Sequence, residues 1–321
     1  MKLSKRIMIV AAGGLLAAGS LMTEAEGKTF ISIATSTSGG TFYAVGGKLA
    51  DMMSKYIPDI QATAEVTAGG VENARQIKNR KIQIAFMPGD TLYSAVNGIN
   101  EFKSGKIPIT QIASLYPTPL QAIALEKSGI KAFTDLKGKK VSMGAPGSST
   151  AIRAEIVLKA HGLTLSDIKM DKTTSSESAT QLMDRQIHAA FYASGAPMAA
   201  IMDIAAREKI VMLSVTPEAM ARIEKAHPDL FKMVIKEGTY PNMDRPATCV
   251  GNMSILVCPP DASEDLIYQV TRMIFERRDD FTTAHKSLAK DFTLQQAISQ
   301  AKLAPFHPGA LKYYREKGLV K

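Results

Sequence analysis

The chain has 321 residues, a formal net charge of +9 at pH 7, two cysteines and no tryptophan. It contains no dense run of Lys and Arg interleaved with aromatic residues, which argues against nucleic-acid binding. The P-loop, GxGxxG, GxSxG and HExxH patterns are all absent, which removes the usual nucleotide cradles and hydrolase signatures, so we expect no enzyme.

The N-terminus has the pattern of a secretory signal. Lys2, Lys5 and Arg6 precede an almost uncharged run at 7–22, and a small-x-small cleavage site ends at Gly27. A membrane anchor is the weaker alternative, because the run is barely long enough to span a bilayer. No Cys lies near the cleavage site, so we expect no lipid anchor, a mature protein in the periplasm and enough residues for two hydrophobic cores.

The first strand-to-helix corner is uncharged and rich in hydroxyl groups. An alternating run at 30–34 predicts a strand, TSTSGGTFY follows at 35–43, and a helical pattern with Gly46-Gly47 inside indicates close helix packing. Helix N-termini present unpaired N–H groups and a partial positive charge, so this corner can hold an anion without a cation. Two consecutive aromatic residues cannot share one helix face, so one should face a cleft. The candidate ligand-binding residues here are Ser38, Gly40, Thr41, Phe42 and Tyr43.

The chain repeats part of its own plan. Ala74–Phe86 and Ala179–Phe191 are identical at six of thirteen positions, at an offset of 105. Both copies predict a short helix, a tight polar connection and a buried strand. A strand at 141–143, the loop GAPGSST at 144–150 and the helix after it echo the first corner. Two similar α/β lobes are therefore expected.

Two extended segments can join these lobes. Residues 112–125, with two prolines in the middle, predict a crossover, and 248–257 predict the return. Lobes joined in this way can rotate about a hinge. Helical patterns at 263–281, 294–302 and 309–317 should pack back on the first lobe. The expected division is a signal peptide at 1–27, a first lobe at 28–118, a second lobe at 119–247, and the return crossing with C-terminal helices at 248–321.

Four hydroxyl- or glycine-rich corners, at 36–43, 67–73, 145–150 and 173–178, should converge on one cleft if the lobes face each other. For each corner the alternative is that its polar residues only cap a helix. Asn73 is a candidate ligand donor or a cap, and Asp90 is a candidate N-cap or an acceptor for a ligand ammonium. The remaining candidates are Gly147, Ser148, Ser149 and Thr150 in the 144–150 loop, and Tyr192 to Gly195 at a strand end. Arg153 is the cation nearest to that loop, and we expect it at the solvated surface.

The two cysteines, Cys249 and Cys258, flank one extended segment, VGNMSILVC. Their separation along a strand exceeds what a disulfide can bridge, which favours two free, mostly buried thiols. No His or second Cys pair lies beside them, so we expect no metal and no cofactor.

The loops and the C-terminus resemble the TAXI family, the solute receptors of tripartite ATP-independent periplasmic (TRAP) transporters. The resemblance rests on TSTSGGTFYAVGGKLA, TAGGVENARQIKNRKIQIAFMPGD, TDLKGKKVSMGAPGSST and PFHPGALKYYREKG, in this order over the mature chain. It implies an α/β, two-lobed periplasmic-binding-protein type II fold, in which each lobe is a mixed sheet flanked by helices and two crossing segments join the lobes. It also implies a monomer that captures a small organic anion, an acidic amino acid such as glutamate or a dicarboxylate or 2-oxo acid, and delivers it to a TRAP permease.

By motif, the resemblance nominates Thr41, Phe42, Tyr43, Asn73, Asp90 and the loop residues 147–150 for ligand binding. The family commonly has Gly where this chain has Ser149, and the extra Cβ narrows that loop. Two rival functions stay open: an ABC-type receptor for a thiamine-precursor, sulfonate or nitrate-like solute, and a periplasmic sensor or adaptor.

Overall fold

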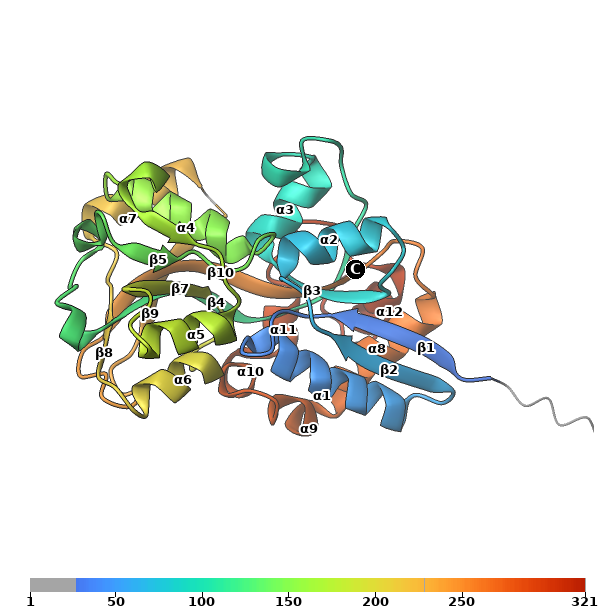
Figure 1. The fold of residues 1–321 in the computed structure, drawn as a ribbon. Helices are drawn as coiled ribbons and strands as arrows, with labels where there is room; N and C mark the ends of the chain where they lie inside the picture. The colour runs from blue at the N-terminus through green and yellow to red at the C-terminus, as the bar shows by residue number, and fades with distance from the viewer. Residues whose placement is uncertain (1–26, 228, 321) are drawn as a thin grey trace, which may run out of the picture.

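The structure is a computed structural model, and it describes residues 27–227 and 229–320. Two lobes lie side by side, and β4 (Thr110–Leu125) and β10 (Ala247–Cys258) run antiparallel through both of them (Figure 1). The expected architecture of two α/β lobes joined by two crossing segments is therefore confirmed. The expected signal peptide lies outside the described residues, except for Gly27, and the division of the chain into segments stays a prediction.

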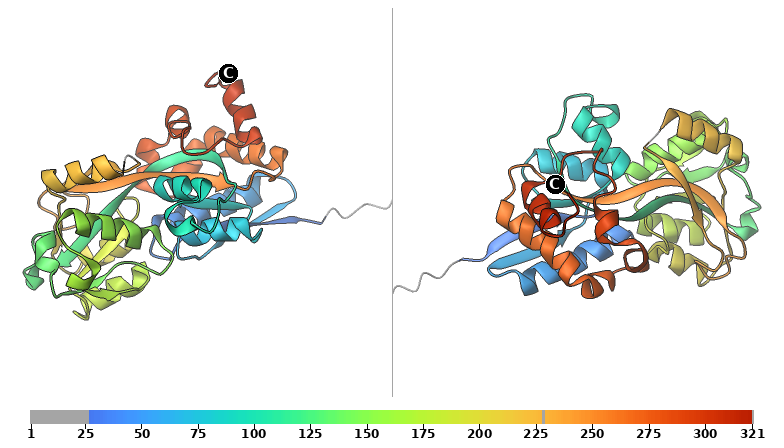
Figure 2. Two further views of the ribbon diagram at one scale, coloured as in Figure 1. Left: turned by 90° about the horizontal axis from the view of Figure 1, so that it is seen from above. Right: turned by 180° about the vertical axis from the view of Figure 1, so that it is seen from behind.

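In the first lobe the strands lie in the order β2-β1-β3-β10-β4. β1 pairs parallel with both β2 and β3, because helices α1 and α2 provide the connections between them. The C-terminal helices α8 to α12 pack on this lobe, as Figure 2 shows from above and from behind. The bounds are β1 (Thr29–Ala34), β2 (Ile60–Glu65), β3 (Ile84–Pro88), α1 (Thr41–Tyr56), α2 (Gly70–Lys78), α3 (Gly89–Asn97), η1 (Asn100–Phe102), α8 (Glu264–Glu276), α9 (Arg278–Thr282), α10 (Lys286–Asp291), α11 (Leu294–Ala297) and α12 (Pro308–Glu316).

In the second lobe the order is β4-β7-β5-β6, while β8 pairs with β4 and β9 pairs with β10. The two crossing strands therefore belong to the sheets of both lobes. The bounds are η2 (Glu126–Ser128), η3 (Phe133–Leu136), β5 (Lys140–Ser142), α4 (Ser149–Ala160), η4 (Leu165–Asp167), β6 (Lys169–Asp171), α5 (Ser175–Met183), β7 (Ala189–Ala193), α6 (Ala199–Ala205), β8 (Ile210–Met212), α7 (Pro217–Ala226) and β9 (Phe231–Ile235).

The repeated segments adopt the same conformation. After α2 and after α5 the chain turns through an arginine with positive φ, Arg80 at 55° and Arg185 at 57°. In each copy the N–H of the following residue donates to a glutamine carbonyl of the helix, at 3.0 Å and 2.8 Å. Phe86 and Phe191 then occupy equivalent, buried positions in β3 and β7. The six shared residues thus mark a shared helix-turn-strand unit, and the internal repeat is confirmed.

Each lobe has hydrophobic clusters on both faces of its sheet, because strand side chains alternate between the faces. In β3, Phe86 packs with α1 and the C-terminal helices, whereas Met87 packs with α2 and α3. In β7, Phe191 packs with α4 and α7, whereas Tyr192 packs with α5 and α6. Helices on both faces of each sheet leave the strand ends free to form the interface between the lobes.

The C-terminal helices differ from the expected ranges. The pattern at 263–281 forms two helices, because Arg277 has φ −113° and ψ 36° and interrupts the run. In 294–302 only the first four residues form a helix, and α10 has no counterpart among the expected elements. His285 and Thr293 cap these short helices through their side chains. Helices of four to six residues depend on caps and packing, and they leave little periodic signal in the sequence.

Cys249 and Cys258 are free and buried, as expected. The strand between them separates them by about 30 Å at the usual rise per residue. Burial raises the pKa of both thiols to about 12. Across the part of the chain that the structure describes, no helix combines the length and the apolar character that crossing a membrane requires.

The two glycines inside α1 have different surroundings. A Cβ on Gly46 would lie 2.3 Å from Thr35 Cγ2 and 3.3 Å from the Phe86 ring, so the close packing expected from the sequence is confirmed there. A Cβ on Gly47 would meet nothing within 4 Å. The helix therefore needs glycine at the first position only.

Gly46→Ala and Gly47→Ala should change stability in opposite directions. Gly46→Ala should lower the free energy of unfolding by about 1–3 kcal/mol through overpacking against Thr35. Gly47→Ala should raise it by about 0.5–1 kcal/mol, because alanine loses less backbone entropy in a helix. Urea denaturation of both variants measures this, and equal effects at the two positions would contradict the assigned packing.

Candidate ligand-binding site between the lobes

The four corners meet around one small cavity between the lobes. It encloses about 40 Å³, and all four expected corners contribute to its wall. Among the described residues that line it, none is charged. The lining residues are Ser36, Thr37, Gly40, Phe42, Ala68, Gly69, Gly70, Gly144, Ala145, Ser148, Ser149, Thr150, Ser175, Ser178, Phe191, Ala193, Ser194 and Met198. The convergence that the sequence predicted is therefore present.

Helices α1, α2, α4 and α5 all begin at this cavity. The first N–H groups of a helix have no partner inside the helix. Side chains cap many such ends, but α1, α2 and α4 have no side-chain cap. Only α5 has one, through Thr174. The alternative that the corner residues merely cap their helices therefore does not hold for three of the four corners.

The loop before α4 contributes the most distinctive hydroxyl group. Gly144 and Gly147 have φ of +90° and +79°, which a side chain would strain. Thr150 Oγ1 accepts from the Ala193 N–H at 3.3 Å. Ser148 Oγ is buried and has no hydrogen-bond partner among the described residues. Buried hydroxyl groups are normally bonded, so Ser148 is a donor that a ligand can use.

Three of the expected site residues hold the lobes together. The Thr41 N–H donates to Ser194 Oγ at 3.0 Å, and the Thr41 hydroxyl donates to the Gly195 carbonyl at 3.2 Å. Ser38 Oγ lies 3.3 Å from Ser176 Oγ across the same boundary. These contacts connect the start of α1 with the second lobe. Ser38, Thr41 and Gly195 thus close the cavity from one side and lie outside its lining.

Two further candidates lie in the packing around the cavity. The Asn73 amide donates to the carbonyls of Thr35 and Phe86 at 2.8 Å and 2.7 Å, and its oxygen accepts from Thr67. This amide is fully used, so it fixes the corner between β2 and α2. The Tyr192 hydroxyl accepts from Ser178 at 3.1 Å in the core, and burial raises its pKa.

The two consecutive aromatic residues separate as the sequence predicted. Phe42 lines the cavity and packs against Phe86 with 5.5 Å between ring centroids. Tyr43 lies on the other side of the helix and is exposed. Of all the sequence candidates, the cavity wall therefore contains Gly40, Phe42, Ser148, Ser149 and Thr150.

Asp90 and Arg153 form a buried ion pair that links the two lobes. Arg153 Nε and Nη2 donate to the two Asp90 carboxylate oxygens at 2.6 Å and 3.1 Å. The remaining guanidinium N–H groups donate to the Thr118 carbonyl of β4 at 2.8 Å and to Asn252 Oδ1 of β10 at 2.5 Å. The expectation that Arg153 is solvated is wrong, because its side chain is fully buried among these four acceptors. Nor is Asp90 an N-cap, since Pro88 occupies that position of α3.

The electrostatics of this pair follow from its geometry. Burial on its own raises the pKa of Asp90. The Arg153 charge and the hydrogen bonds from Arg153 and the Thr91 N–H outweigh burial and hold that pKa below its ordinary value. Sequence reasoning missed Asn252 as a member of this site. The available signal was the one amide side chain in a strand whose other residues are apolar or carry small hydroxyl groups.

The comparisons with known proteins place this fold. The NMT1-like family model matches residues 33–318, and the chain belongs to this family. A solved structure from Bordetella bronchiseptica RB50 is 15% identical, with 91% of this chain and 98% of that chain covered and a TM-score of 0.53. The binding-protein component of an ABC phosphonate transporter from Pseudomonas aeruginosa is 13% identical, with 80% and 78% covered and a TM-score of 0.49.

The alkanesulfonate-binding protein SsuA from Xanthomonas axonopodis pv. citri, bound to MOPS, is 12% identical, with 92% and 95% covered and a TM-score of 0.46. At these identities, structural likeness informs on the fold alone. The chain has the α/β fold of periplasmic binding proteins, with a mixed sheet and flanking helices, as the sequence predicted.

The resemblance to the TAXI family, and with it the TRAP permease as partner, is wrong. The family whose model matches, over residues 33–318, is the NMT1-like family. The physical reason is that the motifs behind the resemblance lie largely in corner loops. Glycines and hydroxyl groups are common wherever a strand turns into a helix, so they do not specify a family or a membrane partner.

Asp90→Asn should destabilise the protein in a pH-dependent way. The change leaves the buried Arg153 charge unmatched, so we expect the free energy of unfolding at pH 7 to fall by about 3–5 kcal/mol. Because the folded-state pKa of Asp90 is lowered, the pair stabilises above the ordinary value of 3.8, and this stability is lost as pH falls through the lowered folded-state pKa.

Urea denaturation at pH 7 and at pH 3 measures this difference, which should shrink at pH 3. The matched control is Asp203→Asn, which neutralises an exposed carboxylate of α6. Equal stability of Asp90→Asn and the wild type at pH 7 would show that the ion pair contributes nothing.

Proposed function

We propose that the protein is an extracytoplasmic solute receptor that closes two lobes over a small organic anion and presents it to the permease of an ABC-type transporter. The observation that carries this proposal is the convergence of four helix N-termini, two from each lobe, on one cavity with an uncharged lining. The receptor is proposed to act in the periplasm as a binding protein without catalytic activity.

Three features of the cavity support an anion as the ligand. Three of the four helices begin there without a cap from their own N-cap side chain, and the positive ends of their dipoles are directed at the cavity. Ser148 adds an unpartnered hydroxyl group. The lining holds no carboxylate that would repel a negative charge. Phe42, Phe191 and Met198 supply apolar surface for the organic part of the ligand.

The size of the cavity favours a compact head group. A volume of about 40 Å³ accommodates only a few heavy atoms. A longer ligand needs the lobes to stand further apart, and hinge motion about the two crossing strands provides for this. An ABC-type permease is favoured as partner by the NMT1-like family assignment, and a sulfonate is the head group that we expect to fit best.

A calorimetric titration of the mature protein tests the ligand class. Methanesulfonate, methylphosphonate, glutamate and 2-oxoglutarate serve as anions of different head group and length, and dimethyl sulfone is the neutral analogue of methanesulfonate. We expect methanesulfonate to bind and dimethyl sulfone not to bind, because the N–H donors and helix dipoles stabilise a negative charge. The proposal fails if a neutral or cationic solute binds at this cavity while no anion does.

Ser148→Ala should weaken ligand binding without changing stability. Its hydroxyl group has no hydrogen-bond partner among the described residues, so its removal breaks none of the hydrogen bonds seen there. We expect the affinity for methanesulfonate to fall by about tenfold to a hundredfold, the usual value of one hydrogen bond to a charged group. Ser104→Ala, at an exposed loop serine, is the matched control. Unchanged affinity in Ser148→Ala would exclude this residue from the site.

A further inference from the structure

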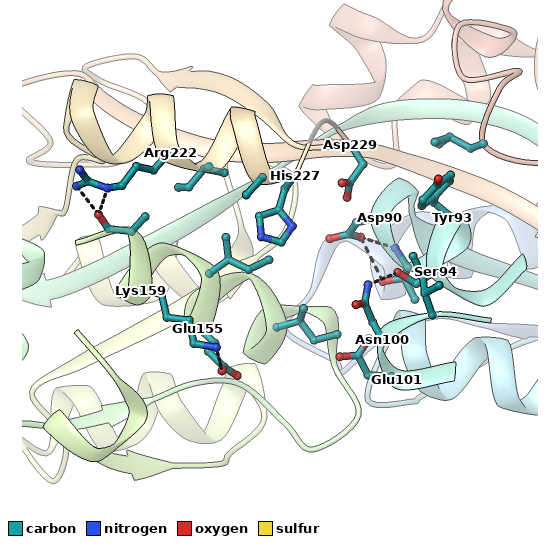
Figure 3. A pocket seen from close by; sticks show the side chains of 18 of the residues that line it. Asp90, Tyr93, Ser94, Asn100, Glu101, Glu155, Lys159, Arg222, His227 and Asp229 are labelled. Carbon is teal, nitrogen blue, oxygen red and sulfur yellow. Dashed lines mark hydrogen bonds and ion pairs between the residues drawn. The ribbon is translucent and has the colours of Figure 1, made fainter. Parts of the chain in front are cut away.

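A second hollow, much larger than the cavity, opens between the lobes. This groove encloses about 900 Å³ between α3 and η1 of the first lobe and α4 and α7 of the second lobe (Figure 3). It shares no lining residue with the cavity. Its volume falls within the range of about 300–1,000 Å³ that is typical of small-molecule sites.

Each long wall of the groove carries apolar side chains among polar ones. Ile152 and Ile156 of α4 and Ile223 of α7 line one side. Tyr93 and Ile99 line the opposite side and are 41% and 39% exposed, among the most exposed large hydrophobic residues that the structure describes. An apolar slot that spans two lobes can hold a short hydrocarbon chain.

The α3 end of the groove carries an unmatched negative charge. Figure 3 shows the Asp229 side chain pointing towards Asp90, across the gap between the lobes. Arg153 lies behind them, but its N–H groups are used by Asp90, Thr118 and Asn252. No ion pair to Asp229 is present among the described residues. The single positive charge of Arg153 therefore acts on two carboxylates, those of Asp90 and Asp229.

The surroundings of Asp229 disfavour the charged form of its carboxyl group. Burial raises the pKa of its carboxyl group, and the nearby Asp90 charge raises it further. Its own backbone N–H, His227 and Arg153 act in the opposite direction without restoring the ordinary value. A carboxylate held in this way gains from a cation that enters the groove.

The other charged residues on the groove do not supply that cation. Lys159 pairs with Glu155 at 2.6 Å, and Arg222 donates twice to the Ala160 carbonyl. Glu101 is exposed and carries a negative charge itself. Lys302 is also exposed, and within the described ranges no ion pair joins it to Asp229. Among the described residues of the groove, Asp229 is therefore a carboxylate without a cation bonded to it.

We propose that the groove binds a small organic cation, a primary ammonium ion with a short apolar chain. The ammonium group lies between Asp90 and Asp229, and the chain lies along Ile152, Ile156 and Ile223. Because the two carboxylates and the two walls come from different lobes, the occupied groove favours the closed arrangement. Binding there therefore strengthens anion capture in the cavity, and this last step rests on the proposed receptor function.

The first test is direct binding of n-butylammonium chloride to the mature protein, measured by calorimetry at constant ionic strength. We expect binding of n-butylammonium and none of n-butanol, which has the same chain without the charge. Asp229→Asn should weaken n-butylammonium binding at least about tenfold, equivalent to about 1.4 kcal/mol. Asp203→Asn, which neutralises an exposed carboxylate outside the groove, should leave binding unchanged.

Asp229→Asn should fold normally, because it removes a charge that is costly to bury and that forms no ion pair within the described part of the chain. Its thermal midpoint should equal or exceed that of the wild type, which separates a lost ligand contact from a damaged fold. The proposal is overturned if n-butylammonium fails to bind, or binds the wild type and Asp229→Asn equally.

The second test measures the coupling. With n-butylammonium at saturation, the wild type should bind methanesulfonate several-fold more tightly, and Asp229→Asn should show no such increase. A methanesulfonate affinity that does not respond to bound n-butylammonium overturns the coupling. Absence of all anion binding would overturn the receptor function instead, and the direct n-butylammonium titration would still decide the groove.

Discussion

The rest of the structure depends on the antiparallel pair of β4 and β10. These strands run through both lobes and pair at Gly251 and Pro119 near their middle. A Cβ on Gly251 would lie 2.6 Å from the Thr118 carbonyl oxygen and 2.8 Å from Pro119 Cα, so the close approach of the strands requires glycine there. Because both sheets are built on this one pair, the strand ends of the two lobes, and the helices that follow them, face a common gap.

Uncharged and charged side chains occupy different positions around that gap. Among the described residues, all side chains that line the cavity are uncharged. The guanidinium group of Arg153 is buried a short distance further along α4. Asp90 neutralises this guanidinium locally, so the field in the cavity comes mainly from helix N-termini. A buried ion pair of this kind does not by itself imply high stability. Its geometry specifies how α3, α4, β4 and β10 meet, since Arg153 bonds to all three of the other elements.

Local patterns made the corners predictable, and distant partners made the ion pair unpredictable. The glycines and hydroxyl groups of TSTSGGTFY and GAPGSST predict strand-to-helix turns, and the repeat in Ala74–Phe86 predicts the helix-turn-strand unit of each lobe. Arg153 looks like a surface residue because its acceptor, Asp90, is 63 positions away in the other lobe. Asn73 looks like a ligand donor for a similar reason, since the carbonyls that occupy its amide become visible only when β1 and β3 are in place.

Helix α4 contributes residues to both the cavity and the groove, so a movement of this helix changes both. Ser149 and Thr150 at its start line the cavity, Ile152 and Ile156 line the groove, and Arg153 between them bonds to the crossing strands. A helix moves as a rigid body, so a displacement that enlarges the cavity also moves Arg153 relative to Asp90 and changes the width of the groove. A ligand shifts such an equilibrium only through its different affinity for the open and closed states. Residues from both lobes line each hollow, so a ligand in either one would contact fewer of them in an open state than in the closed state.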